Sequence, residues 1–379
     1  MPDERTLVTL HLNTERTFRG GEVQTLGLVR LLTRKGHRAI LLAREGGPLL
    51  ERALAAGVEA FPWSPRGEWD LASALRLHRF LVREEVDLIH AHTAHALTLA
   101  LVARGPRSVP KVVASRRVSF PLRGPLSKAK YGRADAVVAV SGPIRDALVA
   151  DGLDPAKVRV VHSGVDLSRF MHLPDRAAAR RALAIPPQKL VVGVVGALVG
   201  HKGHGHFLSA FNRLWVEVPQ AFAVFVGDGR NRAVLEHQAA AGGLPVRFAG
   251  EMAEPAPVYP AFDMLVLPSR SGEGSPGVIK EAAAAGVPVV ATNLSGTSEI
   301  LRDGEEALLV PPEDSGVMAR AMLRLAADPE LRRALAARAR VRVEEFSLEA
   351  TAERTWEVYL DLLGPAEARR GLVSAQSRK

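Results

Sequence analysis

Two glutamates beside a glycine-rich turn are the residues best suited to chemistry. The segment 271–281 reads SGEGSPGVIKE and follows a short apolar run. Ser275 and Pro276 are typical of an N-cap and a first helical position, which predicts a loop that passes into a helix. The free N–H groups of a first helical turn bind phosphate. Glu273 precedes this turn and Glu281 follows it, so one carboxylate can reach past a phosphate while the other accepts hydrogen bonds from vicinal hydroxyls, as on a ribose. The alternative is a capped surface helix whose glutamates are incidental.

A basic block forms the second candidate site. Nine lysines and arginines, without one acid among them, lie between residues 104 and 133: Arg104, Arg107, Lys111, Arg116, Arg117, Arg123, Lys128, Lys130 and Arg133. Such a block attracts an anionic membrane surface or a phosphorylated acceptor. Leu122, Leu126 and Tyr131 would add apolar contacts to a membrane. Nucleic acid is not expected, because the block lacks interleaved aromatic residues that stack on bases. The alternative is a solvated face of an arginine-rich protein.

The histidines are weaker candidates. His90 and His92 end an apolar run, at the position where ligands of open α/β sheets bind. His92 is a candidate for the acceptor or sugar site, and a structural hydrogen-bonding role is the alternative. The three histidines of the loop 201–206 have no carboxylate neighbours, and the chain has no Asp-x-Asp pair. No metal site is therefore expected.

Composition limits the class of protein. The chain has 379 residues, 47% of them hydrophobic and 24% charged, with a net charge of +9 and no cysteine. Disulfides, thiolate chemistry and cysteine-based zinc sites are excluded. The N-terminal segment carries Asp3 and Glu4 and does not read as a signal peptide. No apolar run reaches the roughly 20 residues that span a bilayer. We expect a cytoplasmic protein, with peripheral attachment to the inner face of the membrane as a further expectation.

The elements that must hold these residues follow an α/β pattern. Short apolar runs such as 86–89, 190–195 and 264–267 alternate with amphipathic stretches. Runs without polar alternation are typical of parallel strands covered on both faces. The sequence therefore predicts Rossmann-like domains over residues 1–170 and 171–350. Residues 351–379 are expected to form a helix that returns to the N-terminal domain, followed by a basic tail.

The motifs together resemble those of retaining glycosyltransferases of the GT-B fold, and more closely glycosyltransferase family 4 (glycosyl transferases group 1). Glu273 and Glu281, with seven residues between them, are similar to the E-x7-E signature. The other matching segments, which extend over nearly the whole chain, are 20–22, 87–92, 160–170, 196–203, 227–229, 299 and 308–311. The resemblance implies an N-terminal acceptor domain and a C-terminal nucleotide-sugar domain that face each other across a cleft.

The resemblance also implies how a donor is bound. Lys202 would bind the donor diphosphate, Glu281 the ribose hydroxyls and Glu273 a hydroxyl of the donor sugar. Main-chain groups would face the phosphates and the transferred sugar at Gly20, Gly21, Gly274, Ser275, Pro276, Gly277 and Val278. The donor would be a UDP, GDP or ADP sugar bound without metal. The acceptor would be a glycan, lipid-linked or phosphorylated compound of cell-envelope polysaccharide or lipopolysaccharide synthesis.

Two positions depart from the family pattern. Ala197 stands where the family has a phosphate-binding arginine, so the site has one positive charge fewer to stabilise the leaving group. Arg117 stands where the family often has a histidine near the reacting centre, so the expected catalytic set is Lys202, Glu273, Arg117 and His92. Either Arg117 supplies the charge that the second domain has lost, or the acceptor is itself anionic.

Three other classes of protein fit the sequence less well. A hydride-transferring Rossmann enzyme would show G-x-G-x-x-G after its first strand, and the stretch 13–21 has no such fingerprint. A sugar-nucleotide epimerase or a glycan phosphorylase shares the fold, but a phosphorylase would need a far longer chain and a pyridoxal-binding lysine. A basic scaffold that binds nucleic acid is the third class.

Overall fold

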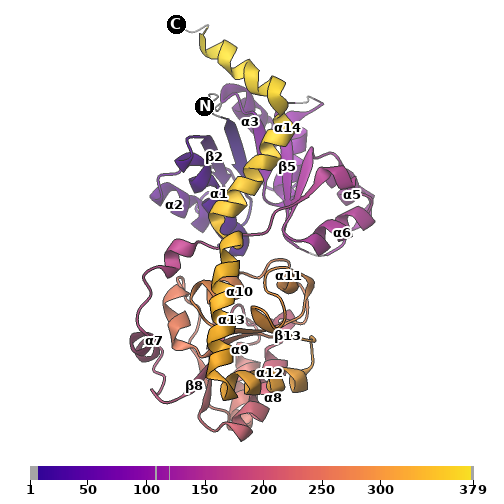
Figure 1. Cartoon of the computed structure of the whole chain (residues 1–379). Coiled ribbons are helices and arrows are strands. Elements are labelled where there is room, and N and C mark those ends of the chain that lie inside the picture. Colours follow the sequence, from indigo (N-terminus) through magenta and orange to yellow (C-terminus); the bar gives the residue numbers. More distant parts are fainter. Residues whose placement is uncertain (1–6, 107–108, 119, 377–379) are drawn as a thin grey trace. The chain divides into compact units, whose positions relative to one another are not determined.

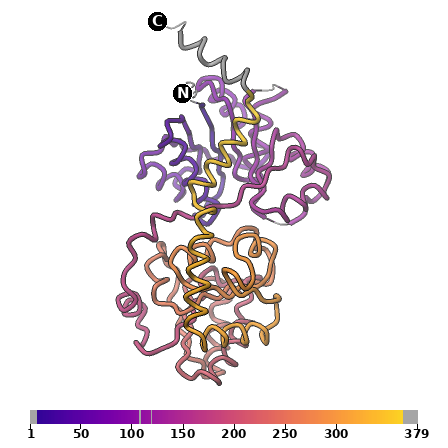
Figure 2. Tube along the Cα trace, viewed as in Figure 1, coloured from indigo at the N-terminus to yellow at the C-terminus, as the bar shows by residue number. Residues whose placement is uncertain are grey.

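The computed structural model describes residues 7–106, 109–118 and 120–376, with side chains described as far as 364. It divides into two compact units (Figures 1 and 2). The first unit comprises residues 1–164 and 348–379, and the second comprises 165–347. Each unit is built on one parallel sheet, so the predicted α/β fold class is confirmed.

The first unit has a seven-stranded sheet. Its strands lie in the order β3 (Ala60–Pro62), β2 (Arg38–Ala43), β1 (Val8–Leu12), β4 (Leu88–Ala91), β5 (Lys111–Arg116), β6 (Ala136–Ala139) and β7 (Val158–Val160). Its connecting helices are α1 (Gly20–Arg34), α2 (Pro48–Ala55), α3 (Leu71–Arg83), α4 (Ala94–Arg104), α5 (Gly124–Gly132) and α6 (Gly142–Ala150). The order reverses between β1 and β4, and ligands of open parallel sheets bind at such a switch point.

The C-terminal helix α14 (Leu348–Gln376) belongs to the first unit and packs against α1. Its Trp356 ring stacks on His37 at a centroid distance of 3.7 Å, and Tyr359 is fully buried. This is the predicted return of the last helix to the N-terminal domain. The helix is labelled in Figure 1. Within the described residues, no helix is both long and apolar enough to cross a bilayer.

The second unit has a six-stranded sheet. Its strands lie in the order β10 (Val246–Phe248), β9 (Ala221–Val226), β8 (Leu190–Val195), β11 (Met264–Leu267), β12 (Val289–Thr292) and β13 (Ala307–Val310). Its helices are α7 (Arg176–Ala182), α8 (His204–Glu217), α9 (Arg232–Ala241), α10 (Gly277–Ala284), α11 (Ser295–Ser298), α12 (Ser315–Ala327) and α13 (Pro329–Arg342). The switch point lies between β8 and β11, and the loops after these strands carry Lys202 and Glu273.

Candidate active site

The loop after β8 brings Lys202 to the loop after β11. Lys202 lies in a short 3-10 turn (Gly200–Lys202), and its Nζ donates to Glu273 Oε1 at 2.7 Å. The hydroxyl of Ser269 donates to the same oxygen. Only 6% of the Glu273 side chain is exposed, against 25% for Lys202. The ammonium group is therefore the solvent-facing member of the pair and is available to an anionic ligand.

Two glycines allow these loops to approach closely. Gly203 has a φ of +69°, and a Cβ there would lie 2.0 Å from the carbonyl oxygen of Pro268. A Cβ on Gly296 would lie 2.3 Å from the carbonyl oxygen of Glu273. Since real Cβ atoms do not approach so near, a side chain at either position would displace the backbone that carries Lys202 or Glu273.

The predicted capping of α10 is wrong. The helix begins at Gly277, its N-cap is Pro276, and no side chain caps it. The hydroxyl of Ser275 instead accepts a hydrogen bond of 3.1 Å from the ammonium group of Lys280, a fully buried residue that the sequence reasoning did not select. The early N–H groups of α10 thus receive no bond from Ser275, which leaves this helix end free to bind an anion.

Glu281 lies within α10 beside two residues that the sequence reasoning did not assign to the site. The hydroxyl of Tyr259 donates to Glu281 Oε2 at 2.6 Å, and Arg169 Nη1 lies 3.8 Å from Oε1. Complete burial, with Glu281 beside it, raises the pKa of Tyr259 well above its ordinary value, so the phenol stays a donor. One carboxylate oxygen is therefore fixed by Tyr259. Arg169 falls inside the matching segment 160–170, but nothing in the sequence marks Tyr259.

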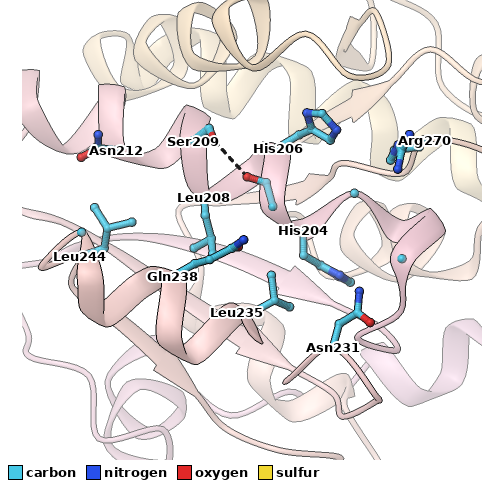
Figure 3. A pocket seen from close by; sticks show the side chains of 14 residues that line it. His204, His206, Leu208, Ser209, Asn212, Asn231, Leu235, Gln238, Leu244 and Arg270 are labelled. Atoms are coloured by element: carbon cyan, nitrogen blue, oxygen red, sulfur yellow. Dashed lines mark hydrogen bonds between the residues drawn. The ribbon is translucent and has the colours of Figure 1, made fainter. Parts of the chain in front are cut away.

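A polar pocket of about 680 Å³ lies behind the Lys202 loop, between α8 and α9 (Figure 3). His204, His206, Asn231, Gln238 and Arg270 are among its lining residues. Figure 3 shows the His204 ring turned toward Asn231. Burial lowers the pKa of His204 to about 4, and the ring packs edge-on against Phe225. His204 packs in the core, and the group of possible metal ligands found among the described residues does not include the histidines of this loop.

In the first unit, Arg117 and His92 meet at the carboxyl end of the sheet. Arg117 Nη2 lies 3.3 Å from His92 Nδ1. A Cβ on Gly21 would lie 3.6 Å from Arg117 Cδ, so the arginine rests against the first turn of α1. Burial lowers the pKa of Arg117 to about 10, and the nearby Glu22 opposes this change. Arg117 therefore keeps its positive charge at neutral pH, and it forms no ion pair with a carboxylate among the described residues.

His92 belongs to a buried chain of hydrogen bonds that starts at Arg117. His92 Nε2 lies 3.1 Å from His11 Nδ1, and His11 Nε2 lies 3.2 Å from Thr9 Oγ1. Since the guanidinium can only donate, His92 must accept at Nδ1 and donate from Nε2, and His11 must then donate to Thr9. His90 completes the cluster, with its ring nitrogens bonded to Tyr359 and Ser115 at 2.6 and 2.8 Å.

All three histidines of this cluster are neutral at physiological pH. Burial lowers the pKa of His11 to about 3 and holds the pKa values of His90 and His92 well below their ordinary range. Their nitrogens lie close enough together to hold a metal ion. Every ring nitrogen already has a hydrogen-bond partner, however, and the Arg117 cation lies beside them. The geometry therefore favours a hydrogen-bond network that orients Arg117, rather than a metal centre.

The structure corrects the interpretation of the basic block. Leu122 and Tyr131, expected to contact a membrane, are 4% and 3% exposed and belong to the core of the first unit. Arg104 pairs with Asp135 at 2.5 Å, Lys130 with Glu68 at 2.9 Å and Lys128 with Asp151 at 3.5 Å. Arg107 lies outside the described residues. The arginines at 123 and 133 are exposed and have no carboxylate partner within the described part of the chain.

Comparison with known proteins gives consistent results for both halves. Residues 18–169 match the family model "Glycosyltransferase Family 4", and residues 175–342 match "Glycosyl transferases group 1". The chain is 33% identical over 314 residues to the D-inositol 3-phosphate glycosyltransferase of Kineococcus radiotolerans, covering 76% of this chain and 69% of that protein. It is also 33% identical over 306 residues to the enzyme of the same name from Streptomyces bingchenggensis, of which it spans 63%.

Solved structures show the same fold. HepE of Anabaena in complex with UDP and glucose has a TM-score of 0.82 at 21% identity, over 93% of this chain and 99% of that one. A glycosyltransferase from Rickettsia africae has a TM-score of 0.86 at 18% identity, over 95% and 99%. The two parallel sheets are thus those of the GT-B fold, as the motifs predicted.

Proposed function

Because the chain belongs to glycosyltransferase family 4, we propose that it transfers a sugar from a nucleoside diphosphate sugar to an anionic acceptor, with retention of configuration. One observation carries this proposal. The second unit places Lys202, Glu273 and Glu281 around the free N-terminus of α10, at the switch point of its sheet. A cation, an uncapped helix end and two carboxylates match the phosphates and the hydroxyls of such a donor.

The donor roles follow from these positions. Lys202 and the N–H groups of α10, from Gly277 onward, would stabilise the diphosphate as its bond to the anomeric carbon breaks. Glu281, held by Tyr259, would accept hydrogen bonds from the ribose hydroxyls. When the diphosphate binds the ammonium group of Lys202, Glu273 loses its partner. Glu273 would then accept a hydrogen bond from a hydroxyl of the donor sugar. Retention requires that the acceptor oxygen bond to the anomeric carbon on the face that the diphosphate leaves, and the proton of the acceptor hydroxyl would pass to the departing diphosphate oxygen on that face.

The acceptor would carry a phosphate, and Arg117 is the residue that would bind it. This cation is half-buried, is oriented by His92 and has no carboxylate partner in the described chain. The guanidinium is partly desolvated and Glu22 is nearby without forming an ion pair with it, so an anionic ligand that paired with it would stabilise its charge. The relatives named D-inositol 3-phosphate glycosyltransferases support a phosphorylated acceptor. A lipid-linked phosphate of cell-envelope polysaccharide or lipopolysaccharide synthesis would meet the same requirement.

We propose in addition that the protein works at the inner face of the membrane. The exposed guanidinium groups of Arg123 and Arg133 support this location, since a cation near an anionic leaflet contributes about 1 kcal/mol. Co-sedimentation with anionic vesicles at low salt should occur and should disappear at moderate salt. A protein that stays in the supernatant at low salt would restrict the proposal to soluble acceptors.

The transfer reaction is tested by donor turnover. The purified chain is incubated with UDP, GDP and ADP sugars, with D-inositol 3-phosphate or unphosphorylated inositol as acceptor, and the released nucleoside diphosphate is measured. We expect release with one donor class and a marked preference for a phosphorylated acceptor. NMR of the product reports the anomeric configuration, and an inverted product would refute retention.

The role of Arg117 has a matched control in its neighbour. Arg117→Gln should raise the acceptor KM about 10- to 150-fold, since a charged hydrogen bond contributes about 1.5–3 kcal/mol. Arg116→Gln should leave the acceptor KM unchanged, because that side chain lies over the Tyr131 ring and donates to the carbonyl of Phe120. Equal effects of the two substitutions would contradict the assignment.

A further inference from the structure

A second cavity, of about 690 Å³, lies in the first unit beside α4 and α5. Its apolar lining includes Leu101 and Val102 of α4, Leu126 of α5, and Trp69 from the loop before α3. α5 is labelled in Figure 1. The volume lies within the range of about 300–1,000 Å³ that is usual for sites that bind small molecules. None of these four residues belongs to the proposed donor or acceptor machinery.

Three of these four apolar residues are exposed to solvent, whereas Leu101 is buried. Trp69, Leu126 and Val102 are 69%, 75% and 42% exposed, and among the nine residues of α5 only Tyr131 is buried. An adjoining hollow of about 340 Å³ shares Val102 with the groove and continues to Leu75. Contiguous exposed apolar surface marks an interaction site in a soluble protein. The groove and the hollow also share Gly105 and Pro106, so the two are continuous and together can accommodate a hydrocarbon chain.

The charged side chains around the groove favour an anionic partner. Glu68 is the one carboxylate among the described residues of the lining, and Lys130 neutralises it at a distance of 2.9 Å. Arg123 and Arg133 also line the groove, and neither has a carboxylate partner among the residues that the structure describes. The groove therefore offers apolar surface together with two uncompensated guanidinium groups.

We propose that this groove binds the hydrocarbon chain of a phosphate-bearing amphiphile, with the phosphate held by Arg123 and Arg133. A second copy of the chain is disfavoured, because its net charge of +9 would meet two unpaired cations. A neutral apolar ligand would leave both guanidinium groups without a partner. The inference goes beyond the transfer reaction and does not depend on the roles of Lys202 or Arg117.

Binding of monomeric alkyl phosphates tests this proposal directly. The full chain is titrated by calorimetry with hexyl, octyl and decyl phosphate below their micelle concentrations. We expect one molecule bound per chain, with a Kd that tightens about two- to fourfold per added methylene. Decyl glucoside, which has the same chain and a neutral head, should bind more weakly. A Kd that does not change with chain length, or no saturable binding, would overturn the proposal.

Substitutions at exposed positions separate the groove from the rest of the surface. Leu126→Ser should weaken decyl phosphate binding about tenfold or more, and Arg123→Gln and Arg133→Gln about fivefold each. The control is Val216→Ser in α8 of the second unit, where the valine is also exposed, at 72%. Equal affinity of the Leu126→Ser and Val216→Ser proteins for decyl phosphate would refute the assignment of the binding site to the groove.

Two other outcomes would assign the surface to a different partner. A dimer in sedimentation that Leu126→Ser converts to a monomer would mean that a second copy covers the groove. Binding to anionic vesicles without binding of any monomeric alkyl phosphate would mean a flat membrane contact with no chain inside the groove. Either outcome would overturn the proposal, whereas loss of donor turnover alone would leave it standing.

Discussion

Substitution of Lys202 by alanine is the most direct perturbation of the proposed donor site. The ammonium group lies at the end of a constrained 3-10 turn, and the tight contact of Gly203 with Pro268 fixes the position of that turn. Its charge is therefore already in place when the diphosphate leaves. Loss of one such preorganised group costs about 2.7–4 kcal/mol in the transition state. We expect kcat to fall about 100- to 1,000-fold.

The structure predicts a second effect of the same substitution. Without Lys202, the nearly buried carboxylate of Glu273 keeps, among the residues that the structure describes, only the hydroxyl of Ser269 as a hydrogen-bond donor. A buried group that loses its partner costs about 1–3 kcal/mol, and the partial exposure of Lys202 places the expected loss at the lower end of that range. The free energy of unfolding should therefore be measured alongside turnover, and Lys202→Ala/Glu273→Gln should recover stability without recovering kcat.

A lysine pair elsewhere in the chain provides the control. Lys35 Nζ lies 2.8 Å from Glu353 Oε1, nearly the same distance, but both side chains are largely exposed. Lys35→Ala should cost less than about 1 kcal/mol of stability and leave kcat unchanged. The assay is release of nucleoside diphosphate at saturating donor and acceptor. A Lys202→Ala protein that turns over donor within threefold of the unmodified chain would refute the donor-loop assignment.

Three further predictions concern the same chain. Glu281→Ala should raise the donor KM about 10-fold or more with little change in kcat, since a ribose is held equally in the ground and transition states; an unchanged KM would disprove the ribose role. Donor turnover should survive EDTA, because the proposed diphosphate contacts are a lysine and helix N–H groups; loss with EDTA and recovery with Mn²⁺ or Mg²⁺ would show a metal requirement. Stability should also depend on pH through His11, whose pKa falls from 6.5 to about 3 on folding. Between these two pKa values the unfolded chain binds more protons than the folded chain. The free energy of unfolding should therefore be greatest above pH 6.5 and decrease as the pH falls toward 3, with a slope approaching about 1.4 kcal/mol per pH unit for each such histidine. Denaturant titrations at pH 8, 6 and 5 measure this slope, and equal midpoints at all three would contradict it.

The sequence by itself determined the fold class and most of the strands. Leu190–Val195 and Met264–Leu267 are uninterrupted apolar runs because both faces of a central parallel strand are covered, and such runs are visible without tertiary information. The strand Ala60–Pro62 went unpredicted, since it has three residues and two of them are exposed. The spacing of Glu273 and Glu281 and the resemblance of the 196–203 segment to the family motif predicted that these two residues and Lys202 serve one donor site, and the structure brings Lys202 within hydrogen-bond distance of Glu273.

Tertiary structure decided what these residues touch. Tyr259 and Arg169 reach Glu281 from 22 and 112 positions away along the chain, and His11 joins His92 across two neighbouring strands. Contacts between residues so far apart in the sequence depend on how the sheet is assembled, so a local sequence pattern cannot predict them. The same reason explains the wrong expectation for Leu122 and Tyr131. Both stand among cations in the sequence, but the first unit turns their side chains into its core, because burying an apolar side chain gains about 1.5–3 kcal/mol.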